Sequence, residues 1–193
     1  MRHKYIIHLS IVLALLSGAL ILVPAEARAH CDTMDGPVVK AAQLALATRN
    51  VNLVLIWVQN KDEAEIVQRF RQTLVVRRLS LQARQLADNY FFETLVRLHR
   101  AGEGEPYTGL KPAGTDLGPI IPLADKALQE GSTEALLKMF AAPEQADIQR
   151  RLQDIKTKNN FKENDVAAGR EFVKAYIGFM HYVEHLYEER QKT

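Results

Sequence analysis

Cysteine is almost missing from this sequence: Cys31 is the only one in 193 residues. A single thiol excludes an intramolecular disulfide, so the fold does not depend on one. The sequence also has no glycine-rich phosphate loop and no G-x-S-x-G turn of the kind that serine hydrolases use. After residue 29, no apolar run approaches the roughly 20 residues that span a bilayer. These absences exclude several common enzyme classes and a multi-span membrane protein.

The first 29 residues have the pattern of a secretory signal peptide. Basic residues open the chain, an almost wholly apolar run extends from Leu9 to Val23, and Ala27-Arg28-Ala29 has the small-x-small form of a cleavage site. We predict cleavage after Ala29 and export to the periplasm or the extracellular space. His30 precedes Cys31 where a lipoprotein signal has a small residue, so we do not expect lipidation. An uncleaved signal that anchors the chain is the alternative.

The predicted mature chain carries no net charge. The signal peptide removes three of the 25 basic residues and one of the 23 acidic ones, which leaves 22 of each. A nucleic-acid binder needs a basic surface to neutralise phosphates, so we expect no nucleic-acid partner. We also expect no membrane partner after cleavage, and a soluble protein with residues 30–193 as one domain, a length that supports a real hydrophobic core.

Helical periodicity dominates the mature chain, and no stretch alternates convincingly as a β-strand does. The apolar run from Val51 to Val58 would fit a buried strand by itself, but its neighbours favour a helix. We therefore predict an all-α helical bundle. The expected helices cover about 35–48, 51–59, 62–78, 81–101, 120–130, 133–141, 144–158 and 165–189.

A weak internal repeat divides the bundle. Shifting the sequence by 82 positions aligns the helix start Asp35-Gly36-Pro37 with Leu117-Gly118-Pro119, and His99 with His181. Eleven of the 67 positions from Thr33 to His99 are identical under this shift. We predict two similar halves, about 33–101 and 115–189, packed about a pseudo-two-fold axis. Residues 102–122 join them in a glycine- and proline-rich loop, a length that usually indicates a functional loop or a linker.

Signal cleavage would create a metal-binding terminus. The mature chain would begin His30-Cys31, which places an amine, an imidazole and a thiolate within two residues. Imidazole suits copper, nickel and zinc, while thiolate favours copper(I) and zinc or supports a nickel site. Only four histidines and one cysteine remain in the mature chain, and two of these five are its first two residues. The alternative is a frayed terminus that carries them by chance.

Three further histidines are candidate ligands. His181 and His185 are four residues apart, so one helix face presents both, as metal ligands require. His99 lies on the apolar stripe of its helix, and the repeat pairs it with His181 and pairs Glu103 with His185. Buried histidines with ordinary hydrogen bonds are the alternative. We predict metal ligation by His30 and Cys31, completed by His99, His181 and His185.

The sequence argues against two specific metalloenzyme motifs. The segment from His181 to His185 matches the inverted zinc-protease pattern H-x-x-E-H, but it ends eight residues from the C-terminus, with no room for a downstream third ligand. A ferritin-like di-iron bundle needs Glu-x-x-His, and positions 96, 178 and 182 hold Val, Gly and Tyr instead.

Two resemblances follow from these residues. The opening from His30 to Gly36 resembles the metal hook of nickel superoxide dismutase, which uses the terminal amine, the first cysteine's amide, two thiolates and the terminal imidazole. Asp35 stands where that hook has its second cysteine. The segments HCDTMDGPVV, FFETLVRLHRAGEGEPYTGLKPAG and FMHYVEHLY resemble a bacterial family of exported proteins described as a domain of unknown function.

We therefore expect an exported helical protein that binds a copper, nickel or zinc ion at its processed N-terminus. One alternative is a redox metalloenzyme that handles superoxide or a related oxidant. The other is a protein without metal whose loop 102–122 binds a protein partner. The sequence itself does not identify such a partner.

Overall fold

The computed structural model describes residues 30–192, and within that range the protein is all-α, as predicted. The predicted signal peptide lies outside the described residues. The only β-type pairing in the described part is one isolated parallel bridge, between Thr33 and Lys111. The helices are α2 (Pro37–Thr48), α3 (Asn52–Leu55), α4 (Glu63–Val76), α5 (Leu81–Glu103), α6 (Ile120–Glu130), α7 (Glu134–Leu137), α8 (Ala142–Lys158) and α9 (Val166–Gln191). Two 3-10 turns, η2 (His30–Asp32) and η3 (Asn60–Asp62), also lie within residues 30–192.

Local sequence signals set the ends of the two longest helices. Ser80 caps α5, because its hydroxyl oxygen accepts a hydrogen bond from the Ala83 amide at 3.0 Å. Gly104 ends the same helix in the left-handed conformation, which glycine adopts without a steric penalty. Asp165 caps α9 in the way that Ser80 caps α5. The ambiguous apolar run from Val51 to Val58 contains helix α3 and no strand.

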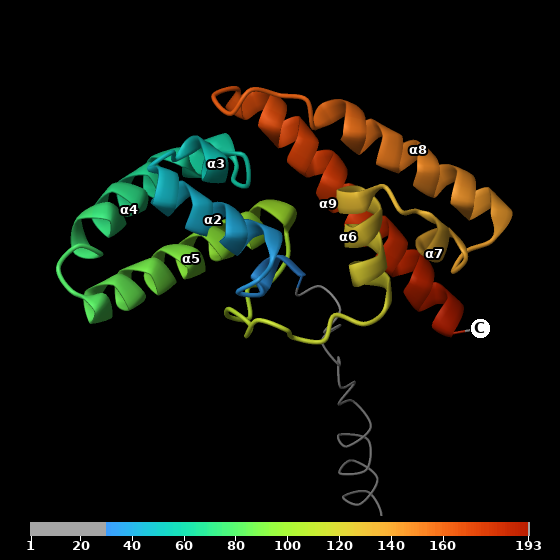
Figure 1. The fold of residues 1–193 in the computed structure, drawn as a ribbon, viewed down its shortest axis with the longest axis horizontal. Coiled ribbons are helices and arrows are strands. Elements are labelled where there is room, and N and C mark those ends of the chain that lie inside the picture. Colours follow the sequence, from blue (N-terminus) through green and yellow to red (C-terminus); the bar gives the residue numbers. More distant parts are fainter. Residues whose placement is uncertain (1–29, 193) are drawn as a thin grey trace, which may run out of the picture.

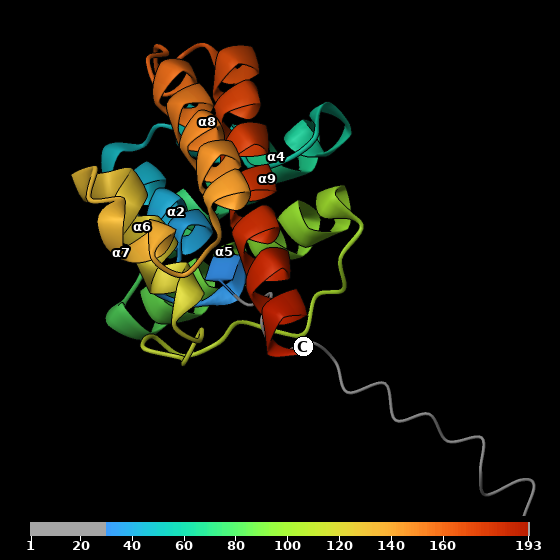
Figure 2. The same ribbon diagram turned by 90° about the vertical axis from the view of Figure 1, so that its right-hand side faces the viewer.

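The helices form two groups that share one core. In Figure 1, α2 to α5 occupy one side of the molecule and α6 to α9 the other, with α9 running between α8 and the first group. Helix α4 packs along α5, and α8 packs along α9, so each group has a long helical hairpin. Figure 2 shows α8 and α9 side by side, and α6 packs against α9. No helix among the described residues is both long and apolar enough to cross a membrane.

The order of the helices is the same in both groups. Each has a helix of about three turns, a single-turn helix and then two long helices. Shifting α3 by 82 positions gives residues 134–137, the bounds of α7, and shifting α2 gives 119–130, against 120–130 for α6. The predicted repeat requires this agreement. The superposition of the two groups about a pseudo-two-fold axis stays a prediction.

The connection between the groups holds the start of the folded chain. Residues 104–119 form this connection, and the amide of Lys111 donates to the Asp32 carbonyl at 2.9 Å. The Lys111 carbonyl accepts from the Met34 amide at 3.0 Å, and the Gly114 amide donates to the Asp35 carboxylate at 3.0 Å. The glycine- and proline-rich loop therefore fixes residues 32–35 against the body of the protein.

Candidate functional site

The start of the folded chain is buried rather than frayed. His30 is 8% exposed and Cys31 5%, and Asp32 and Thr33 are less exposed still. The side chains around them come from α5, α6 and α9, so both groups of helices contribute. We call the resulting buried polar group the terminal cluster: His30, Cys31, Asp32, His99, Arg100, Glu103, Asp125 and Tyr176.

His30 is oriented by a carboxylate of α6. Its Nε2 lies 2.8 Å from Asp125 Oδ2, and the other oxygen of Asp125 accepts from the Tyr176 hydroxyl of α9 at 3.2 Å. Because a carboxylate holds Nε2, the lone pair of the neutral imidazole is on Nδ1. Nδ1 is buried and has no hydrogen-bond partner. The ring therefore presents one unsatisfied nitrogen to the interior.

Cys31 is a buried thiol in negative surroundings. Burial raises its pKa well above the usual value, and the nearby Glu103 carboxylate raises it further, while Arg100 lowers it. A thiolate needs positive charge nearby to form at neutral pH. Without an additional cation, Cys31 is therefore a neutral and unreactive thiol.

Arg100 is the central cation of the terminal cluster and faces three carboxylates. Its guanidinium lies 3.6 Å from Asp32, 3.2 Å from Glu103 and 3.9 Å from Glu105. One guanidinium does not balance three carboxylates, and burial is the largest influence on the pKa of two of them. It raises the pKa of Asp32 to about 6 and that of Glu103 to about 7, against the lowering effect of Arg100.

His99 is a buried, neutral imidazole with a defined tautomer. Its Nδ1 lies 2.9 Å from the Trp57 carbonyl oxygen, which only accepts, so Nδ1 carries the proton. Nε2 lies 3.2 Å from Glu103 Oε1 without forming a hydrogen bond. Burial lowers the pKa of His99 to about 4, so the Nε2 lone pair is free of a proton at neutral pH.

The other two predicted ligands lie at increasing distance from the terminal cluster. His181 is half-buried on α9, and it is near enough to His99 to lower the pKa of that ring. His185 is exposed, and its Nε2 lies 3.1 Å from Glu189. The structure thus brings His30, Cys31 and His99 into the cluster, leaves His181 beside it, and places His185 outside. Across residues 30–192, no three or more His, Cys, Asp or Glu side chains gather in a way that could hold a metal ion.

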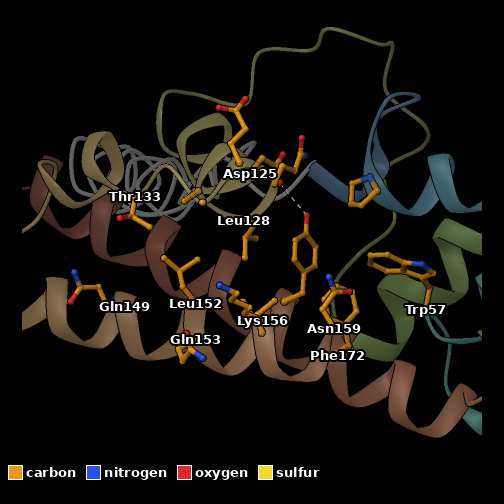
Figure 3. A pocket seen from close by; sticks show the side chains of 17 residues that line it. Trp57, Asp125, Leu128, Thr133, Gln149, Leu152, Gln153, Lys156, Asn159 and Phe172 are labelled. Carbon is orange, nitrogen blue, oxygen red and sulfur yellow. Dashed lines mark hydrogen bonds between the residues drawn. The ribbon is translucent and has the colours of Figure 1, made fainter. Parts of the chain in front are cut away.

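A cleft leads from the surface to the edge of the terminal cluster. Its volume is about 860 Å³, and it lies between α6 with the turn after it on one side and α8 and α9 on the other. Figure 3 shows Trp57 at one end, Thr133 and Gln149 at the other, and Asp125 between them. Trp57 closes the inner end, where its ring meets His99 and Tyr176 edge-on at centroid distances of 5.6 and 6.1 Å. Small molecules therefore have a route from solvent to the Tyr176–Asp125 pair.

Sequence reasoning missed four members of the terminal cluster: Asp32, Arg100, Asp125 and Tyr176. The sequence could have predicted that Asp125 faces the interior. It follows Ile121 by four residues and precedes Leu128 by three, so it lies on the apolar stripe of its helix. A carboxylate in such a stripe has to find a partner in the interior. Arg100 follows His99 directly, but periodicity alone places it beside the stripe and gives no sign of its burial.

Comparison with known proteins identifies a family. Residues 35–182 match the sequence pattern described as a family of unknown function, DUF6448. No curated protein and no solved structure matches the chain. The matched residues include α2 to α8 and most of α9, and they contain His99, Arg100, Glu103, Asp125 and Tyr176. The resemblance to an uncharacterised family is therefore confirmed, whereas its bacterial and exported character stays a prediction. The chain belongs to DUF6448, a family of unknown function.

Proposed function

We propose that the mature protein is exported and binds one transition-metal ion through its processed N-terminus. The ligands are the terminal amine and Nδ1 of His30 and the thiolate of Cys31. His99 and His181, the nearest helix histidines, border this site and are not counted among its ligands. His185 pairs with Glu189 at the surface and is left out of the proposed ligand set.

The unsatisfied Nδ1 of His30 is the observation that carries this proposal. A buried nitrogen without a partner costs free energy that a ligand would recover. Nδ1 is also the ring nitrogen that closes a six-membered chelate with the amine of the same residue. Metal-binding histidines commonly give their other nitrogen to a carboxylate, and Asp125 takes that position at 2.8 Å.

Charge supports a cation at this place. Asp32, Glu103, Glu105 and Asp125 outnumber the one guanidinium of Arg100, and the pKa values of Asp32, Glu103 and Cys31 are raised. A bound metal ion would reverse the raised pKa of the Cys31 thiol, because a metal lowers the pKa of a coordinating thiol until the thiol loses its proton. Metal binding would therefore offset the excess of buried negative charge.

The proposed ligand set needs two side chains and one main-chain amine. It is thus compatible with a described chain that has no group of three or more ligand side chains. Amine, imidazole and thiolate serve copper, nickel and zinc alike, so all three ions are candidates.

Native mass spectrometry tests the proposal. The protein is expressed with residues 1–29, purified without a tag, and analysed before and after addition of copper, nickel or zinc. We expect a mass that begins at His30 and carries one metal ion. Three variants follow: Cys31→Ser, one alanine inserted before His30, and the surface control His185→Gln. The first two should lose the ion and the control should keep it. A chain that begins at His30 and takes up none of the three ions would overturn the proposal.

A further inference from the structure

The exposed large apolar side chains of the described residues gather in one region. There are seven, and six lie between positions 75 and 90, around the turn that joins α4 to α5. Leu79 is 75% exposed, Leu86 74% and Val75 66%. The full set is Leu44, Val75, Val76, Leu79, Leu81, Leu86 and Tyr90. This clustering of exposed apolar side chains indicates a surface that binds another apolar surface.

The same region is strongly basic. Residues 66–87 contain five arginines and no acidic residue, although the predicted mature chain as a whole is neutral. Arg77 pairs with Asp88, and Arg69 lies over the Tyr90 ring. Arg71, Arg78 and Arg84 are exposed. Exposed arginines and exposed apolar side chains thus occur in the same segment of the chain.

The region is the projecting end of a helical hairpin, which we call the hairpin tip (residues 71–86). Figure 1 shows the turn between α4 and α5 at the outer edge of the molecule, at the far end of α5 from the start of the folded chain. The Ser80 cap and the bidentate pair between Arg77 and Asp88 hold the turn in shape. From Leu81 to His99 the helix rises by about 27 Å, so the hairpin tip is remote from the terminal cluster.

We propose that the hairpin tip docks on the surface of an anionic lipid bilayer. Leu79, Leu81 and Leu86 would enter the interface between headgroups and acyl chains, while Arg71, Arg78 and Arg84 would contact anionic headgroups. Exposed apolar side chains interspersed with arginines at the outer end of a helical hairpin fit a fluid anionic lipid surface better than a preformed protein groove. A second copy of this chain is disfavoured, because self-pairing would bring the arginines of two tips together.

This proposal differs from the expectation that the mature chain has no membrane partner. That expectation rested on the lack of a second spanning segment, and surface docking needs none. The proposal is also independent of metal binding, because it involves none of the residues of the terminal cluster.

Vesicle flotation tests the docking. The mature chain is mixed with vesicles of phosphatidylcholine alone or with vesicles that also contain phosphatidylglycerol, whose negative surface charge attracts basic segments. We expect at least tenfold more bound protein on the anionic vesicles, and loss of this excess in high salt. Leu79→Glu and the triple change Arg71→Gln, Arg78→Gln and Arg84→Gln should each lower binding at least tenfold. All four side chains are exposed, so circular dichroism should show an unchanged fold.

A matched control removes three exposed basic side chains elsewhere: Lys126→Gln, Lys138→Gln and Arg150→Gln. This variant should bind as the parent does. Equal loss in the control would overturn the proposal in favour of unspecific charge attraction. Absence of binding to anionic vesicles would overturn it outright. So would a dimer in sedimentation velocity that Leu79→Glu dissociates, because the tip would then be an interface between two copies.

Discussion

At the scale of single residues, Asp125 decides how His30 is presented. It holds Nε2 of that ring and also accepts from Tyr176, so one carboxylate fixes two aromatic side chains from different parts of the chain. An asparagine of the same shape has no charge and offers one acceptor oxygen instead of two. His30 would then lose the negative charge behind its ring and would compete with Tyr176 for the one remaining acceptor oxygen.

We therefore predict that Asp125→Asn weakens metal retention by roughly 10- to 100-fold, the usual range for removing a carboxylate behind a histidine ligand. Competition with a chromophoric chelator measures this change on protein that begins at His30. Glu189→Gln is the control, because Glu189 pairs with the exposed His185. Equal affinities for Asp125→Asn and the parent protein would contradict the assigned role of Asp125.

The raised pKa of Glu103 predicts a pH-dependent stability in the metal-free protein. Its pKa is 4.5 in the unfolded reference and about 7 in the folded protein. Between these values the folded state holds a proton that the unfolded chain has lost, so the unfolding free energy falls as pH rises from about 4.5 to 7. His99 acts in the opposite sense, because its pKa falls from 6.5 to about 4 and its contribution is lost as pH drops through that range.

The substitution Glu103→Gln isolates the contribution of Glu103 to this pH dependence, because His99 is present in both proteins. The unfolding free energy of the variant minus that of the parent should increase by about 3 kcal/mol as the pH rises from 4.5 to 7. Urea unfolding in the presence of a chelator, at several pH values, measures the difference. A difference that does not change with pH would show that Glu103 titrates normally in the folded protein.

At the scale of elements, the short turn η2 depends on a glycine. A Cβ at Gly36 would collide with the carbonyl oxygen of His30, which is main chain and cannot rotate away. Gly36 has an ordinary negative φ of −74°, so close approach and not backbone strain requires glycine here. This contact explains why a glycine comes just before Pro37 at the start of α2.

Two glycines make a matched pair for testing this point. Gly36→Ala should destabilise the protein by about 1–3 kcal/mol, the range for forcing extra atoms into packed surroundings. Gly178→Ala should instead stabilise it by up to about 1 kcal/mol, because Gly178 is inside α9 with open space where its Cβ would lie. Urea unfolding of both variants measures whether each substitution lowers or raises the unfolding free energy. Destabilisation by both would indicate that helix α9 is more crowded than the structure has it.

The elements were predictable where a local signal existed. Periodicity predicts a helix over about 81–101, which is within two residues of the observed end of α5 at Glu103. The terminal cluster was only partly predictable. His30, Cys31 and His99 were identified by residue type, whereas Asp125 and Tyr176 join them from positions 95 and 146 residues beyond His30. Periodicity predicts which face of a helix is buried, but not which two buried faces meet.

At the scale of the whole molecule, the terminal cluster is not repeated in the second half. The shift of 82 positions that pairs His99 with His181 pairs Arg100 with Tyr182, Trp57 with Met139 and Asp32 with Gly114. The second half therefore lacks the central guanidinium, the indole and the carboxylate at the equivalent places. If the halves are related, they have diverged at the residues that make the cluster.

Because the terminal cluster joins α5, α6 and α9, a ligand there should stabilise the entire fold. We predict that metal at 100 times its dissociation constant raises the unfolding free energy of protein beginning at His30 by about 2.7 kcal/mol. Thermal unfolding with and without metal measures this increase. A protein with one extra alanine before His30 serves as the control and should show no increase. Equal stabilisation of both proteins would place the metal elsewhere.

The burial of His30 also determines when its surroundings can form during synthesis. The ribosome makes this residue long before Asp125 and Tyr176, the two side chains that hold and cover it. Until α6 has emerged, His30 lacks its hydrogen-bond partner Asp125, and until α9 has emerged it lacks the aromatic ring of Tyr176. The earliest-made residues of the fold are thus among the last to be locked in place, and contacts between such distant positions slow folding.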